Sequence, residues 1–152
     1  MSAIAGFVNF CGTRPDPAII QRMQLVMTPY GRDAQHQLCT DQAAFCRTLL
    51  RTTPEDALDQ QPLVHSASGS VLLFDGRIDN RDELAVRLSI SDESLKTMAD
   101  SQIVQRGLLE QGTDFIVQIV GDFALAWFNR TEQQLHLARD AMGIRPIYWH
   151  RV

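Results

Sequence analysis

The chain has 152 residues, of which 45% are hydrophobic and 21% are charged. This length suits one domain with a single hydrophobic core, and this composition argues against disorder or low complexity. The formal net charge of −4 at pH 7 provides no positive field for nucleic acid or anionic lipid, so we expect neither as a partner.

No window of the sequence has the apolar length of a membrane span, and its start lacks the basic region of a signal peptide. We therefore expect a cytoplasmic protein. The three cysteines form no CxxC pair and the four histidines have no ligand spacing, which argues against a metal site or a disulfide framework. For Cys39 and Cys46, in apolar or strand-like surroundings, we expect buried, reduced thiols.

The first half of the chain predicts a strand, a helix and further strands. Residues 3–10 are apolar on both faces and predict a strand buried on both sides. After Pro15 and Pro17, apolar residues recur at helical spacing and stop before Pro29, which predicts a helix. Strand-like stretches follow at residues 35–39, 42–50 and 70–75.

The second half begins with helices. Asn80, with Glu83 three residues later, predicts a helix to about residue 88 with reciprocal capping. Asp100 is suited to cap a second helix, and Gly112 is suited to its C-terminal turn. A short helical turn is expected at 114–119.

The last third predicts a hairpin buried between layers, formed by residues 123–128 and 135–137. Apolar residues continue through 147–149, so we expect the chain to stop on or beside a strand, with an exposed sheet edge that pairs with a second copy. Strands and helices come in runs rather than in alternation. This order predicts an α+β fold with two mostly antiparallel sheets.

Four segments, taken in order, resemble the glutaminase domain of asparagine synthetase and other class II glutamine amidotransferases. The specific combination is DGRIDN with RDAMGIRPIY, and the segments are residues 2–6, 74–80, 99–101 and 138–148. The resemblance covers nearly the whole chain and implies an N-terminal-nucleophile (Ntn) hydrolase fold, a four-layer αββα sandwich. It also implies that residues 1–152 are a type 2 amidotransferase domain that is incomplete at its C-terminus.

The same resemblance implies a partner. In asparagine-synthetase-like enzymes an ATP-pyrophosphatase synthetase domain follows the glutaminase domain. ATP and Mg are therefore expected only there, and we expect no cofactor in this chain.

The resemblance also implies a nucleophile at position 2. In the family an N-terminal cysteine, exposed by removal of the initiator methionine, attacks the side-chain amide of glutamine, and its own α-amino group acts as the base. Ser2 occupies this position. A serine hydroxyl is far less acidic than a thiol, so we expect a degenerate nucleophile.

A second departure lies at the oxyanion position. Active members use an Asn-Gly pair to donate hydrogen bonds to the oxyanion, and Asp75 and Gly76 stand at the matching positions. An ionised aspartate only accepts hydrogen bonds and repels an oxyanion. The residues by themselves favour another interpretation, because Asp-Gly after an apolar run is typical of a hairpin turn.

Three residues match the family's substrate-binding positions. Asp100 aligns with the aspartate that binds the α-amino group of glutamine, although a helix cap also explains it. Arg47 and Arg51 are both candidates for the arginine that binds the α-carboxylate. Arg139 and Asp140 are expected to form a buried structural pair beneath the turn at 143–148.

Residues 50–55 and 79–84 show a narrower resemblance to lasso-peptide macrolactam cyclases and, more distantly, to β-lactam synthetases. In those enzymes the amino-terminal domain has lost its cysteine and acts as a scaffold. The leading hypothesis is therefore a pseudo-glutaminase domain of an ATP-dependent, amide-forming ligase that acts on a peptide. Two alternatives remain open: an active Ser-dependent amidohydrolase that uses Ser2, and a regulatory domain that binds an amino acid or peptide.

Overall fold

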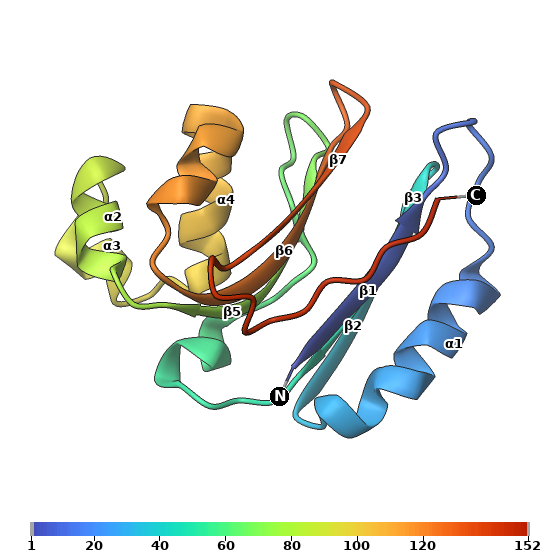
Figure 1. Ribbon diagram of the computed structural model, residues 1–152, viewed down its shortest axis with the longest axis horizontal. Coiled ribbons are helices and arrows are strands. Elements are labelled where there is room, and N and C mark those ends of the chain that lie inside the picture. The colour runs from blue at the N-terminus through green and yellow to red at the C-terminus, as the bar shows by residue number, and fades with distance from the viewer. Residues whose placement is uncertain (1, 152) are drawn as a thin grey trace.

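The computed structural model describes residues 2–151 and shows two antiparallel sheets packed face to face (Figure 1). The first sheet has the order β1-β3-β2, built from β1 (Ala3–Val8), β2 (Ala34–Cys39) and β3 (Ala43–Leu49). The second has the order β4-β5-β6-β7, built from β4 (Leu63–Val64), β5 (Val71–Ile78), β6 (Gly121–Asn129) and β7 (Gln134–Arg139).

Helices cover the outer side of each sheet, which gives the layer order helix, sheet, sheet, helix (Figure 1). Helix α1 (Pro17–Met27) packs on the first sheet. The second sheet is covered by α2 (Arg81–Arg87), α3 (Asp92–Leu95) and α4 (Asp100–Gln111). Three short 3-10 helices are η1 (Thr28–Tyr30), η2 (Pro54–Leu58) and η3 (Gly112–Gln118). The predicted α+β class with two antiparallel sheets is confirmed.

The largest core lies between the second sheet and its helices and contains fifteen buried residues. Strand β5 is buried on both faces because its side chains alternate between two cores. Leu72 and Phe74 face the helices, whereas Val71 and Leu73 pack toward Phe45 of the first sheet. No helix within residues 2–151 is long and apolar enough to cross a membrane.

The predicted burial was too high for residues that lie on the edge strands of the two sheets. Both faces of β1 contact a core, but none of its residues is fully buried, because β1 has a neighbouring strand on one side only. Edge strand β7 is likewise partly exposed, so the predicted hairpin is buried only along β6. Cys46 is buried on central β3, where burial raises the pKa of its thiol to about 11, whereas Cys39 on edge strand β2 is exposed.

One local prediction was wrong, and the end of the chain is more exposed than its apolar pattern indicated. The side chain of Asn80 does not cap α2; it donates to the Gln118 carbonyl and accepts from the Val120 amide, both at 2.9 Å. Asn80 therefore ties the start of α2 to the segment that leads into β6. Residues 141–151 form no strand, and Tyr148 and Trp149 are 91% and 75% exposed.

Candidate functional site

A small cavity of about 30 Å³ lies beside the start of β1 and receives residues from both sheets. We call it the Ser2 cavity. Its eight lining residues are Ser2, Arg47, Leu50, Thr52, Asp56, Asp75, Gly76 and Arg145. Four of the six candidate site residues therefore come together here, and the other two, Arg51 and Asp100, do not line it.

Ser2 sits at the end of the β1–β3 pairing, one residue before Ala3, which is paired with Thr48. Its hydroxyl oxygen accepts a hydrogen bond from the Leu50 amide at 3.1 Å and donates to the Leu50 carbonyl at 3.4 Å. The hydroxyl thus already has a donor and an acceptor on the backbone of the chain. Met1, whose removal would free the α-amino group of Ser2, lies outside the described residues.

Asp75 and Gly76 lie inside β5 rather than in the predicted hairpin turn. Asp75 is paired with Ala124 of β6, and Gly76 is paired with Phe123. Glycine is needed at 76 because a Cβ atom there would collide with the backbone of Asp122 and Phe123. The Asp-Gly signal therefore reflects a close approach of two strands and not a change in chain direction.

The carboxylate of Asp75 is held in a desolvated, charged environment. Arg145 Nη1 lies 3.6 Å from Asp75 Oδ2, and the Asp75 side chain is only 13% exposed. Burial raises the pKa of Asp75 above its ordinary value, and the charges of Arg145 and Arg47 reduce this shift without cancelling it. Asp75 thus places a carboxyl group in poorly solvated surroundings beside an arginine.

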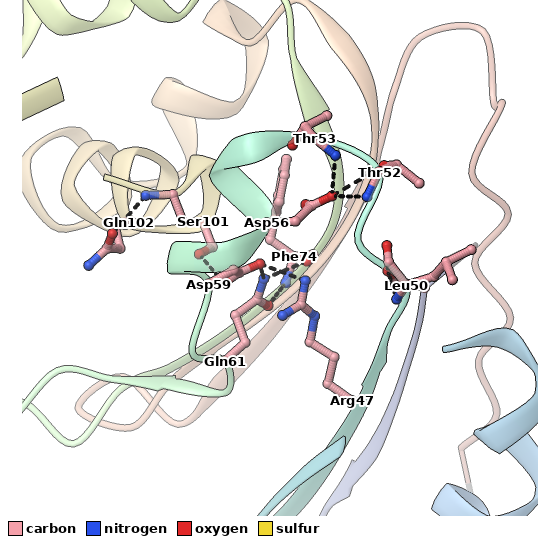
Figure 2. Close-up of polar contacts among 12 residues, drawn as sticks. Arg47, Leu50, Thr52, Thr53, Asp56, Asp59, Gln61, Phe74, Ser101 and Gln102 are labelled. Carbon is pink, nitrogen blue, oxygen red and sulfur yellow. Dashed lines mark hydrogen bonds and ion pairs between the residues drawn. The ribbon is translucent and has the colours of Figure 1, made fainter. Parts of the chain in front are cut away.

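Arg47 extends from β3 into a buried polar network, which Figure 2 shows. Its guanidinium pairs with Asp59, and the two side chains are 4% and 7% exposed. Asp59 also accepts hydrogen bonds from the Ser101 hydroxyl at 2.7 Å and from the Gln61 amide at 2.9 Å. The network thereby connects β3 to α4 through the segment after η2.

The network does not satisfy the whole arginine. Within residues 2–151, the buried Nε and Nη1 atoms of Arg47 have no hydrogen-bond partner. Buried donors without partners are uncommon in folded proteins and usually mark a bound water, a bound ligand or a functional position.

The chain enters the cavity through a tight turn organised by Asp56. Its carboxylate accepts from the backbone amides of Thr52 and Thr53 at 2.6 and 2.9 Å, as Figure 2 shows. Because Thr53 precedes the first residue of η2, this pattern is that of a capped helix start. Thr52 and Asp56 of this turn line the cavity together with Asp75 and Gly76 of β5.

The two candidate arginines have different positions. Arg47 lines the Ser2 cavity, as described above. Arg51 is exposed, and its backbone amide donates to Asp33 at 2.8 Å. Of these two candidates, Arg47 is therefore the one that the fold places at the Ser2 cavity.

Asp100 fastens three elements together. Its carboxylate accepts from the Ile78 amide at the end of β5 at 2.8 Å and pairs with Arg81 of α2. Burial raises the pKa of Asp100, and the Ile78 amide and Arg81 partly offset the effect. The predicted capping role was wrong, because Asp100 is the first residue of α4 and follows Ala99, the N-cap residue.

The expected Arg139–Asp140 pair is not formed, because Arg139 is exposed. Asp140 is buried, and its carboxylate accepts from the backbone amides of Ile144 and Arg145 at 2.9 and 3.1 Å. Burial opposes ionisation, but these amides hold the pKa of Asp140 below its usual range. Asp140 therefore organises the turn that presents Arg145 to the cavity.

A larger groove of about 490 Å³ lies elsewhere, between the end of α4 with η3 and the β6–β7 hairpin. Trp127 and His136 stack beside it, and none of the candidate site residues lines it. Among residues 2–151, no group of three or more His, Cys, Asp or Glu side chains is arranged to hold a metal ion.

A family model described as a glutamine amidotransferase domain matches residues 1–152. The chain belongs to the glutamine amidotransferase family. It is similar to asparagine synthetase [glutamine-hydrolyzing] 2 of Bacillus subtilis (strain 168), with 25% identity over 153 residues, which cover 98% of the chain and 20% of that protein.

Other relatives of this amidotransferase domain match a shorter stretch. The probable asparagine synthetase of Dictyostelium discoideum is 30% identical over 94 residues, covering 60% of the chain and 17% of that protein. The asparagine synthetase of Asparagus officinalis is 31% identical over 94 residues, covering 62% and 16%. The chain thus spans a fifth or less of the length of these relatives.

Sequence reasoning missed Arg145, Asp59 and Gln61 as residues in or behind the site. Arg145 had a signal, because it stands within the RDAMGIRPIY segment that carries the family resemblance. Asp59 and Gln61 lie between two predicted strands and had no such signal, because their partners are far away in the sequence.

Proposed function

We propose that this amidotransferase domain does not hydrolyse glutamine. It serves instead as the structural and interaction domain of an asparagine-synthetase-like enzyme that forms amide bonds with ATP. The observation that carries this proposal is the position of Asp75, whose side chain lines the same cavity as Ser2.

The charge at Asp75 opposes the chemistry of amide hydrolysis. Attack on an amide carbonyl places negative charge on its oxygen, and loss of one oxyanion donor typically costs about 10²–10³ in rate. In this chain the donor is replaced by a carboxylate and not by a neutral group. Arg145 Nη1 lies 3.6 Å from the Oδ2 atom of this carboxylate. We expect the loss to exceed that range.

Ser2 adds a second, independent loss. An alcohol is a poor nucleophile without an adjacent base, and the only base that the family arrangement supplies is the α-amino group of residue 2. The Ser2 hydroxyl is also hydrogen-bonded to both backbone groups of Leu50. Attack would require these two contacts to be given up.

The volume of the cavity supports the same conclusion. Ligand pockets usually exceed roughly 300 Å³, and the Ser2 cavity, at about 30 Å³, has about a tenth of that volume. A cavity of this size accommodates one or a few water molecules, so a glutamine side chain enters only if lining residues such as Arg145 move.

For the whole enzyme we propose a synthetase partner, as a domain or a subunit, that binds ATP and Mg. The resemblance of residues 50–55 and 79–84 supports a lasso-peptide macrolactam cyclase, with a peptide as substrate. In such a reaction a carboxylate of the peptide is adenylated by ATP with release of pyrophosphate, and an amine of the same peptide displaces AMP, so no ammonia from glutamine is needed. A domain without glutaminase activity fits this chemistry.

One observation favours a second function. Arg47 carries two buried N–H groups without partners inside residues 2–151, and a carboxylate could satisfy them. The alternative is therefore a regulatory domain that binds an amino acid or a peptide terminus without turning it over.

The test restores the two missing groups. Ser2→Cys supplies an acidic nucleophile and Asp75→Asn supplies an amide donor, and each change alters few atoms. Each correction should supply on the order of 3 kcal/mol of transition-state stabilisation, and the two should act as a unit. We expect a glutamine-like diazoketone to label residue 2 in the double variant after removal of Met1, and in neither single variant.

Labelling is read by mass spectrometry of the N-terminal peptide, because Cys11 and Cys39 are exposed and react on their own. Glutamine should protect the double variant from the label. If the unaltered protein is labelled at Ser2, the domain is an active serine amidohydrolase and the proposal is wrong. If the folded double variant is not labelled, the loss is not confined to Ser2 and Asp75.

A further inference from the structure

We propose that Arg145 is a positioning residue that restricts entry to the Ser2 cavity by pairing with Asp75, so that the segment at residues 140–151 controls access to residue 2. This inference rests on the proposed function and assigns Arg145 a part in restricting access to residue 2, which is half-buried. Arg145 is not a catalytic residue in this account, because it acts through Asp75 and through the space it fills.

The contact between the two side chains is not a loose surface pair. Arg145 Nη1 lies 3.6 Å from Asp75 Oδ2, and the side chains are 26% and 13% exposed. The Nε atom of Arg145 is buried and has no hydrogen-bond partner within residues 2–151. The guanidinium group is therefore largely withdrawn from solvent, and Asp75 is the opposite charge that it meets.

The backbone holds Arg145 in place for this contact. Asp140 anchors the segment to the second sheet, because its amide donates to the Phe123 carbonyl at 2.8 Å. Its carboxylate then binds the amides of Ile144 and Arg145, and Gly143 turns the chain with φ +69°. Phe123 is the β6 partner of Gly76, next to Asp75, so both charged groups are positioned by one strand pair.

Few other side chains hold this segment down. Ile144, Tyr148 and Trp149 are 58%, 91% and 75% exposed, so they bury little apolar surface against the rest of residues 2–151. Arg145 is thus the side chain through which the segment reaches the cavity. Truncating it should enlarge the cavity and expose residue 2 without removing core packing.

The experiment uses Ser2→Cys as a reporter of access and measures its alkylation by iodoacetamide, resolved by mass spectrometry. Loss of the Arg145 charge and opening of the cavity should change the labelling rate of residue 2 in opposite directions. A thiolate is the reacting species, and loss of the nearby Arg145 charge raises the thiol pKa, which slows labelling at a fixed pH. Closure predicts that S2C/R145A is labelled faster than S2C, by about fivefold, near the upper range for a partly exposed ion pair.

Two further variants and two thiols serve as controls. Arg139→Ala removes an exposed arginine from the same part of the chain, one that forms no ion pair among residues 2–151, and should leave the rate unchanged. Arg145→Lys keeps the charge and should restore slow labelling. Buried Cys46 should remain unlabelled in every variant, which verifies that the protein is folded, and exposed Cys11 provides an internal standard.

A rate in S2C/R145A equal to or below that of S2C overturns the inference, as does an equal acceleration by Arg139→Ala. If Cys46 becomes reactive in the alanine variant, Arg145→Gln replaces it, and the same comparison decides. A pH profile separates the two effects, because access changes the plateau rate and charge shifts the midpoint. Failure of the proposed function is distinguishable, because it appears as glutamate release by the unaltered protein and does not affect the order of labelling rates.

Discussion

Strand β5 passes from an apolar core to a charged cavity within two residues, and the two regions differ in how well their groups are satisfied. Leu72 and Phe74 belong to a core of fifteen buried residues. Asp75, the next residue, enters a cavity where the nearby Arg47 and Arg145 have buried N–H groups without partners among residues 2–151. The amidotransferase fold therefore depends on the core, and the chemistry at the cavity can change without loss of the fold.

The largest effect should come from breaking the core. Phe115 is fully buried, and its ring packs so closely on α4 that a Cβ atom at Gly107 would collide with it. Phe115→Ala should lower the free energy of unfolding by about 4 kcal/mol, measured by urea denaturation. Val117 in the same short helix is 88% exposed, and Val117→Ala should change it by less than about 0.5 kcal/mol. Equal costs for the two variants would contradict this description of the core.

A smaller loss is expected from the network behind the cavity. Asp59→Ala would leave the Arg47 guanidinium buried without its counter-charge, and should cost about 3 kcal/mol in urea denaturation. Asp41 pairs with Arg130 at the surface, where both side chains are more than 40% exposed, so Asp41→Ala should cost no more than about 1 kcal/mol. If the two substitutions cost the same, Arg47 is not dependent on Asp59.

The smallest effect on the free energy of unfolding is expected at Asp75, where a substitution should stabilise the protein rather than destabilise it. Its folded-state pKa lies above the unfolded value of about 3.9, so ionisation disfavours the folded state at neutral pH. Asp75→Asn removes this cost. The variant should be more stable than the unaltered protein at pH 7, and its advantage should disappear as the pH falls toward about 3.9.

Asp140 provides the opposite case for the same measurement. Its pKa is lowered in the folded state, so its stabilising contribution is complete above the unfolded pKa and is lost as the pH falls through the folded value. Asp140→Asn should therefore be less stable than the unaltered protein at pH 7, with a difference that shrinks in acid. Urea denaturation at several pH values checks both signs, and a destabilised Asp75→Asn at pH 7 would refute the first.

The sequence predicted the fold class and most elements, because alternation and helical spacing report burial directly. The pattern at residues 123–128 correctly indicated β6, and the one after Pro17 indicated α1. Glycine at 76 was misassigned, because a glycine required for strand approach looks the same in sequence as a glycine required for a turn.

The site was predictable only through the family resemblance. Ser2, Arg47 and Asp75 come from distant segments, and no local pattern brings them together. Asp100 was assigned as a cap because an aspartate just before a helix and one at its first position give similar signals, and its true partners were not visible locally. Arg145 was overlooked because the contact that brings it to the cavity is with Asp75, seventy residues earlier.

The central claim is that the domain keeps the amidotransferase fold without its glutaminase activity. Glutamate release from glutamine by the purified, unaltered protein tests it most directly, with Ser2→Ala as the matched control. We predict no release above that control, because Ser2 has no thiolate character and Asp75 opposes the oxyanion. Steady release of glutamate that disappears in Ser2→Ala would contradict the account.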